Sequence, residues 1–540
     1  MDATTAHNKA RTARLSGPLR IGLLIDRAHD LDNWQLALID RIRADDRFCL
    51  KALILCPPRQ PKARRRLFRT AAMLERATLG RQPPYPALEP GSSHISVARL
   101  ETFRSSSRAQ ELDLVLALSP LDLDHAAFAM PAFGCWHFSF LDAADHTADW
   151  FGYDEVITGQ PATELTIKVK RHEAGTSEVL ASAWFNTKFS AVRNGDFIKE
   201  RAVSLVLREL RRLAETGTMT TQPLPATAAV AHPPRVRQLL GYVASITKIL
   251  LCRGRQALAS RIKLSAPAWA LFLGEGEADS FDPKMAKLLK PALAEFRADP
   301  FLFAENGELF VFYEAYSARD TKAHIAVARL VDDRLEPIGI ALEAAHHLSY
   351  PFVFRDGDQI FMIPETNHAK RLEVWRATDF PLGWELHTTA LEGQSPADSA
   401  LIRFSGRWWL FTNLSDFHAY EDHCSELYLF EVDGPDLNWM KPHDNNPVVV
   451  GSTEARNGGR PFEHGGRLYR PSQRNDHGIY GYGLNIMEVE ELDLTTYRER
   501  CIRSINPDFA PGIIACHHMD AASGRFIIDA MFEDHSQLLR

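Results

Sequence analysis

Apolar and polar residues alternate in short runs through the second half of the chain, and the same arrangement recurs about every fifty residues. Each copy holds an alternating run, a glycine and a second alternating run, which is typical of a β-hairpin. The copies begin near residues 299, 350, 398 and 460, and a weaker fifth begins near 512. Repeated sheets that bury their faces only against their neighbours predict blades around an axis. We therefore predict a five-bladed β-propeller over residues 265–540, closed by a strand at 269–273 that pairs with the last blade.

The first half has a different pattern. Buried-type apolar runs at 20–26, 50–55 and 112–118 alternate with helical spacing, the clearest over 33–44. Strands that alternate with helices predict a parallel α/β domain, which we place at residues 19–214. The chain is thus a multidomain α/β plus all-β protein. Residues 1–18 are polar and predict a disordered tail.

Two further segments have unusual composition. Residues 57–85 are rich in proline and arginine, and the basic cluster at 62–66 fits either a solvated loop or a phosphate-binding loop. Residues 215–264 predict a linker followed by a helix, in which the stretch 235–263 carries basic residues, no acid and helical apolar spacing. Such a helix either packs on a domain or touches an anionic membrane face as a peripheral contact.

Charge and cysteine content narrow the expected binding partners and the expected cellular compartment of the protein. A net charge of -7 argues against a nucleic-acid partner. The 7 cysteines lack paired or CxxC spacing, so they predict reduced thiols and no metal site. No leader-like or membrane-spanning apolar run stands out, which favours a cytoplasmic protein, at the inner face of the membrane if the basic helix binds there. The oligomeric state is not readable from the sequence.

A motif in the first half resembles the formyltransferase domain that uses a folate formyl donor. The segment 134–141 contains His137 and Ser139 at the family's His and Ser positions, but Cys135 stands where the family has Asn and Glu173 where it has Asp. Cys135 lacks the amide donor that would stabilise an oxyanion. The resemblance therefore implies a vestigial site at Cys135, His137 and Glu173, with no folate or other cofactor expected.

Acidic residues open several repeats of the propeller. Asp299 precedes Pro300, which predicts an extended backbone there; Asp398 opens the third copy and Glu454 precedes the fourth. This arrangement resembles the five-bladed glycosidases of glycoside hydrolase family 43 and its relatives. The resemblance implies Asp299 as general base, Asp398 as the acid that tunes pKa values, and Glu454 as proton donor, which is a two-carboxylate scheme. Glu365, another acid of the repeats, is the alternative proton donor.

A second resemblance concerns the segments 350–354, 363–366, 459–462 and 470–473. They look like the N-terminal propeller of plant glucosamine inositolphosphorylceramide transferases. In those proteins glycosyl transfer is attributed to a different, C-terminal domain, so the resemblance implies a glycan or glycolipid context. Further candidates for binding such a substrate are polar or aromatic residues of the repeats: Arg456, Arg460, Arg470, Gln473, Trp408 and His518.

Three functions follow as hypotheses. The first is a carbohydrate-active enzyme that hydrolyses or transfers a glycosidic bond in the propeller, in the metabolism of a cell-surface glycan or glycolipid. The second is a non-catalytic protein of polysaccharide assembly that binds a glycan or nucleotide sugar. The third is a sugar formyl or acyl transferase that uses the altered N-terminal triad.

Overall fold

The structure is a computed structural model that describes residues 9–12, 17–26, 31–56, 66–80, 96–100, 111–120, 131–141, 151–171, 177–224, 236–261, 268–290, 295–317, 322–415 and 422–533. The chain forms two compact units that divide near residue 246. We describe each unit by itself.

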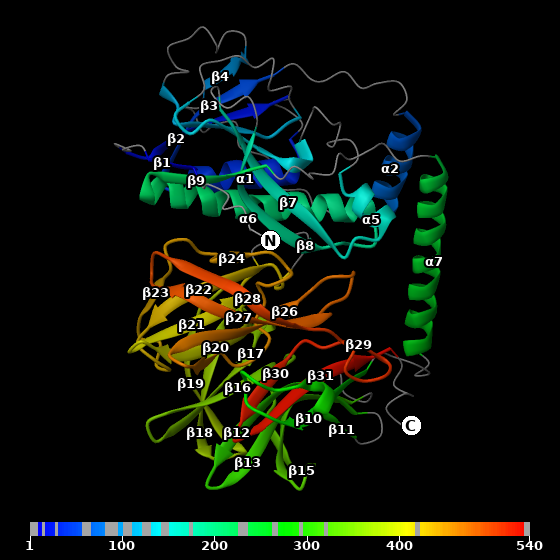
Figure 1. The fold of residues 1–540 in the computed structure, drawn as a ribbon, viewed down its shortest axis with the longest axis vertical. Coiled ribbons are helices and arrows are strands. Elements are labelled where there is room, and N and C mark those ends of the chain that lie inside the picture. Colours follow the sequence, from blue (N-terminus) through cyan, green and yellow to red (C-terminus); the bar gives the residue numbers. More distant parts are fainter. Residues whose placement is uncertain are drawn as a thin grey trace, which may run out of the picture. The chain divides into compact units, whose positions relative to one another are not determined.

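The first unit is built on a nine-stranded sheet in the order β1-β9-β8-β7-β6-β5-β2-β3-β4 (Figure 1). The strands β4, β3, β2, β5 and β6 are parallel, and β7, β8, β9 and β1 continue the sheet in antiparallel fashion. The long helix α6 is buried along most of its length and contacts α1, β7 and β8. The bounds are β1 Lys9–Thr12, β2 Leu19–Ile25, α1 Asn33–Ala44, β3 Phe48–Leu55, α2 Arg66–Leu79, β4 Ser96–Arg99, β5 Leu114–Ala117, β6 Cys135–Phe138, α5 Tyr153–Thr158, β7 Ala162–Lys170, β8 Glu178–Asn186, α6 Ala191–Thr216 and β9 Thr218–Pro223.

The ends of this unit differ from the prediction. Lys9–Thr12 forms strand β1 inside the predicted disordered tail, and it pairs with β9 inside the predicted linker. A run of threonine and methionine at 218–221 suits a strand, and β8 offers β9 an open edge. Part of the predicted insertion at 57–85 is helix α2, whereas the basic cluster at 62–65 lies outside the described residues.

The second unit contains five sheets, each an antiparallel blade, as predicted (Figure 1). The fifth blade joins the two ends of the propeller, since β10 pairs with β31 from Ala268↔Phe532 to Glu275↔Arg525. This pairing confirms the predicted closing strand. The blades consist of β12 Glu295–Glu305, β13 Glu308–Ser317, β14 His324–Val331 and β15 Arg334–Leu342; β16 Ser349–Asp356, β17 Gln359–Glu365, β18 Leu372–Asp379 and β19 Gly383–Ala390; β20 Ala397–Phe404, β21 Arg407–Asn413, β22 Glu426–Val432, β23 Met440–Pro442 and β24 Val449–Val450; β25 Phe462–His464, β26 Arg467–Arg474, β27 Gly483–Leu492 and β28 Tyr497–Ile505; and β29 Ile513–Ala515, β30 Met519–Ala522, β31 Arg525–Phe532, β10 Ala268–Glu275 and β11 Lys287–Leu289.

The first strands of three blades share an irregularity. The register of the ladder shifts after Ala298, after Ser349 and after Ala397, which marks a β-bulge at each site. The bulged residues Asp299, Tyr350 and Asp398 have φ values of 50°, 45° and 45°. The extended backbone predicted for Asp299 is therefore wrong. Asp398 has the same φ without a following proline, so the bulge and not Pro300 determines this conformation.

Helix α7, Val236–Arg261, occupies the predicted basic helix. Within the described parts of the chain, none of the helices combines the length and the apolar character that crossing a membrane requires.

Candidate functional site at the propeller axis

Residues associated with three blades meet where the first strands approach one another. Asp398 is the bulged residue of β20, Glu365 is the last residue of β17, and Arg456 lies in the segment before β25. The Arg456 guanidinium connects the two acids. Its Nε donates to Oδ2 of Asp398 at 2.6 Å, and its Nη2 lies 3.2 Å from Oδ1 of Asp398 and 3.1 Å from Oε2 of Glu365. One cation thus holds two buried carboxyl groups from different blades.

Asp398 and Glu365 have opposite electrostatic environments. Burial alone would raise the pKa of Asp398, but the Arg456 charge and hydrogen bonds to its carboxylate hold that pKa below its ordinary value. Gln473 also donates to Oδ2 of Asp398, at 2.9 Å. Burial raises the pKa of Glu365 well above its ordinary value, and the Asp398 charge adds to this although Arg456 opposes it. The arrangement favours the ionised form of Asp398 and the protonated form of Glu365.

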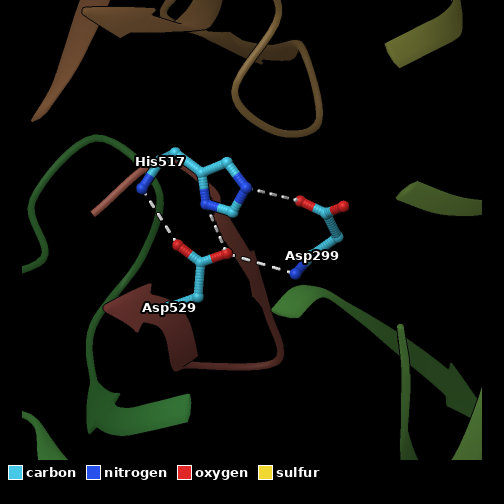
Figure 2. Close-up of side chains that lie close together, drawn as sticks. All are labelled: Asp299, His517 and Asp529. Atoms are coloured by element: carbon cyan, nitrogen blue, oxygen red, sulfur yellow. Dashed lines mark hydrogen bonds and ion pairs between the residues drawn. The ribbon is translucent and has the colours of Figure 1, made fainter. Parts of the chain in front are cut away.

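A second cluster surrounds Asp299 (Figure 2). The His517 ring lies between two carboxylates: Nδ1 is 2.8 Å from Oδ2 of Asp529, and Nε2 is 3.4 Å from Oδ1 of Asp299. Asp529 is fully buried and also accepts the backbone N–H groups of Asp299, His517 and His518 at 3.1, 3.0 and 2.9 Å. Asp529 therefore fixes both the orientation of the His517 ring and the backbone at the Asp299 bulge.

The charges of this cluster follow from its geometry. Burial alone would lower the pKa of His517, but the Asp529 and Asp299 carboxylates outweigh it and raise that pKa to about 9. Burial raises the pKa of Asp299 well above its ordinary value, with His517 opposing and Asp398 adding to the rise. Burial would also raise the pKa of Asp529, but His517 holds it low. His517 is therefore a cation at neutral pH, and it favours the ionised form of Asp299.

Asp299, His517 and Asp529 each offer a ligand atom within 4.8 Å of the others, the spacing of a metal site. The two carboxylates, however, face opposite nitrogen atoms of the ring. A histidine that carries protons on both nitrogens cannot bind a metal. The ion pairs that the structure shows thus compete directly with metal binding at this cluster.

The other two predicted arginines contact the framework of the propeller, Arg460 across blades and Arg470 within its own blade. Arg460 pairs with Asp520 at 3.0 and 3.1 Å and donates to the carbonyls of Val353 and Leu302 at 2.9 and 3.3 Å. Arg470 is fully buried and contacts Glu499. These contacts use the donors that a substrate would need, so we place both arginines in the framework of the propeller.

The structure describes other contacts for three predicted residues. Trp408 pairs with Arg403 near the hairpin turn of its blade, whereas Asp398 lies at the opposite end of β20. The carbonyl of Glu454 accepts a hydrogen bond from Arg470 at 2.7 Å. His518 is fully buried between the rings of Phe301 and Tyr350, and burial lowers its pKa to about 3. The structure thus places His517, not His518, beside Asp299.

The predicted formyltransferase residues are only partly described. Cys135 and His137 are both buried in β6, and burial raises the pKa of the Cys135 thiol to about 12. Glu173 lies outside the described residues. Formyl transfer in this unit therefore stays a prediction.

Two residues of the site escaped sequence reasoning. Asp529 lies in β31, far along the chain from Asp299, and no local motif marks it. Tyr480 is exposed, and its ring lies 5.4 Å from that of His517 and 5.3 Å from the Arg456 guanidinium. An aromatic ring at this place borders both clusters and reaches solvent.

Comparison with known proteins finds sequence relatives of the propeller. Residues 288–509 match the family described as glucosamine inositolphosphorylceramide transferase 1, N-terminal. The transferase 1 of Oryza sativa subsp. japonica is 39% identical over 210 residues, which are 38% of this chain and 28% of that protein. The Arabidopsis thaliana protein is 36% identical over 211 residues, 38% of this chain and 27% of its own length. The chain thus covers less than a third of these relatives. The match includes Asp299, Glu365, Asp398 and Arg456 but not His517 or Asp529.

Solved structures with similarity to this chain include carbohydrate-active enzymes. An exo-β-1,3-galactanase from Phanerochaete chrysosporium shares 11% identity at a TM-score of 0.31 and covers 43% of this chain and 54% of its own. A family 32 β-fructofuranosidase of Bombyx mori shares 12% identity at a TM-score of 0.32, with 40% and 52% covered.

Proposed function

We propose that the propeller acts on a glycosidic bond of a glycan or glycolipid at its axial cluster. In this proposal Glu365 donates the proton to the leaving oxygen, and Asp299 is the base that activates water or an acceptor hydroxyl. Asp398 is the fixed negative charge that keeps Glu365 protonated. Tyr480 stacks on a sugar ring at the solvent side. The scheme invokes no cofactor.

The raised pKa of Glu365 carries the proposal, because it favours the protonated form that a proton donor needs, whereas the cationic His517 favours the ionised form of Asp299. Glycosidic cleavage needs one carboxyl group protonated and one ionised at the same pH. Arg456 contacts both Asp398 and Glu365, so a single cation influences the pKa of each carboxyl group. The two acids belong to different blades, and the circular arrangement of the blades brings them together.

His517 favours the ionised form of Asp299, the proposed base. Burial disfavours an ionised Asp299, whereas the cationic ring 3.4 Å away favours it. Because Asp529 holds His517 charged, Asp299 loses its proton more readily than an isolated buried aspartate would. A protonated Asp299 cannot act as a base. We therefore expect activity to fall at low pH as Asp299 takes up a proton.

The names of the relatives suggest the substrate class. They are named glucosamine inositolphosphorylceramide transferase 1, and part of this chain matches the family described as their N-terminal part. We propose that the propeller handles a sugar attached to a lipid or to a surface polymer, either by cleaving it or by transferring it.

Product analysis by mass spectrometry tests the proposal. The parent protein, Asp299→Asn and Glu365→Gln would be incubated with oligosaccharides and extracted surface glycolipids. We expect products from the parent and a loss of roughly 10²–10⁴-fold in rate for either variant. Glu454→Gln is the matched control and should retain activity. Equal rates in parent and both variants would refute these roles.

A second function is favoured by the burial of the site. The buried Asp398 carboxylate accepts hydrogen bonds from Arg456 and Gln473. This arrangement also suits a rigid site that binds a glycan without catalysing a reaction. Binding of a glycan to the parent and to Asp299→Asn with equal affinity, and no product from either, would establish this alternative.

A further inference from the structure

Helix α7 has one face that packs and one that does not. Its Tyr242 accepts the Ala191 backbone N–H at 2.8 Å and donates to Oε1 of Glu75 in α2 at 2.7 Å. Leu239 and Ile246 pack in the same cluster beside Tyr153. These contacts fix the rotation of the helix about its own axis, so the direction of its remaining side chains is defined.

Two leucines point away from the packed face. Leu240 is 67% exposed and Leu251 is 64% exposed. They are eleven residues apart, which is about three helical turns at 3.6 residues a turn, so they lie in one row along the helix. Large apolar side chains exposed in register over three turns are unusual for a helix that faces only water.

Basic residues form a second row beside the leucines. Arg237 and Lys248 have the same eleven-residue spacing, and both are exposed, as is Arg255. By the helical repeat this row lies about 60° from the leucine row. The whole helix carries five lysine or arginine residues and no aspartate or glutamate. A row of cations without an acid, next to an apolar row, is complementary to a surface that is both anionic and apolar.

We propose that the face of α7 formed by Arg237, Leu240, Lys248, Leu251 and Arg255 binds the surface of an anionic lipid membrane. The leucines enter the boundary between headgroups and acyl chains, and the cations contact lipid phosphates or carboxylates. The proposal does not depend on the chemistry of the propeller. A protein partner or a second copy of the chain would have to match the same charge, and both are outcomes of the test.

Vesicle co-sedimentation of the full chain tests the proposal, with phosphatidylcholine vesicles that contain or lack phosphatidylserine. We expect binding only to the anionic vesicles and release when salt rises from about 0.1 M to about 1 M. Leu240→Ser/Leu251→Ser and Arg237→Gln/Lys248→Gln should each weaken binding roughly tenfold or more.

Matched controls separate this face from general effects. Leu382→Ser/Leu386→Ser and Lys284→Gln/Lys290→Gln change exposed residues of the propeller and should leave vesicle binding unchanged. Circular dichroism and thermal melting show whether the α7 variants fold. Equal binding to neutral vesicles, no binding to either kind, or full binding by the folded α7 variants would overturn the proposal. So would a variant-sensitive dimer in sedimentation that binds no vesicles.

Discussion

The guanidinium of Arg456 is the cationic partner of Asp398, with Nε to Oδ2 at 2.6 Å and both side chains almost fully enclosed. Buried carboxylates are costly unless they are paired and hydrogen-bonded. The pair therefore governs the stability of the axis as well as the charge of the candidate site.

Arg456→Met should destabilise the propeller by about 3–5 kcal/mol, because it leaves Asp398 buried without its cation. Urea unfolding followed by hydrogen exchange of propeller peptides measures the change. Arg376→Met breaks an exposed pair with Glu385 and should cost about 0–1 kcal/mol. Similar costs for the two variants would contradict the assigned role of Arg456.

The raised pKa of His517, about 9, makes stability depend on pH. Its folded-state pKa lies above the unfolded value of about 6.5, so its contribution is fully present below pH 6.5 and is lost as pH rises through 9. The difference in unfolding free energy between the parent and His517→Gln should therefore shrink across this window, by roughly 3 kcal/mol. Unfolding titrations at several pH values check this, and a pH-independent difference would rule it out.

Tyr350→Phe should cost about 1–2 kcal/mol of stability. The buried hydroxyl of Tyr350 donates to the carbonyl of Gly459 at 2.9 Å, and its removal leaves that carbonyl without this donor. Tyr316→Phe, at an exposed ring, is the control and should be nearly neutral. Thermal unfolding of the two variants provides the comparison, and equal melting temperatures would show that the hydroxyl contributes nothing.

Gly274→Ala should weaken the closure of the ring. A Cβ at Gly274 would lie 2.3 Å from the ring of Phe526, its fully buried partner across β10 and β31. Overpacking of this kind costs about 1–3 kcal/mol. At Gly339 a Cβ would meet the exposed Leu382 at an ordinary 3.4 Å, so Gly339→Ala is the matched control. Limited proteolysis should release β10 faster in the first variant alone.

The repeats predicted the propeller because a hairpin is a local structure. Alternating runs around a glycine specify two paired strands within about fifteen residues, and five such units imply a ring. The closing strand at 269–273 was predicted from its position before the first copy, although its pairing with β31 is not local. The first unit was less predictable at its ends, where β1 and β9 form through pairing between distant segments.

The site was predictable only in part. Asp299 and Asp398 lie at the start of repeats. Each repeat starts with the first strand of a blade, and these strands lie nearest the axis, so their place could be predicted from the sequence. Asp529 and Tyr480 have no such mark, because they reach the clusters from other parts of the fold. The prediction of an extended backbone at Asp299 failed because the bulge outweighs the preference of a residue that precedes proline.

The pairing of β10 with β31 has a consequence for synthesis. The two strands that complete the fifth blade are separated by about 250 residues, so the ribosome must release the second before the ring exists. Until then the nascent chain carries four blades with open edges, which invite pairing with other chains. Closure of the circle therefore follows synthesis of all five blades, and the cluster of Asp299, His517 and Asp529, which joins the first blade to the fifth, forms only at that stage.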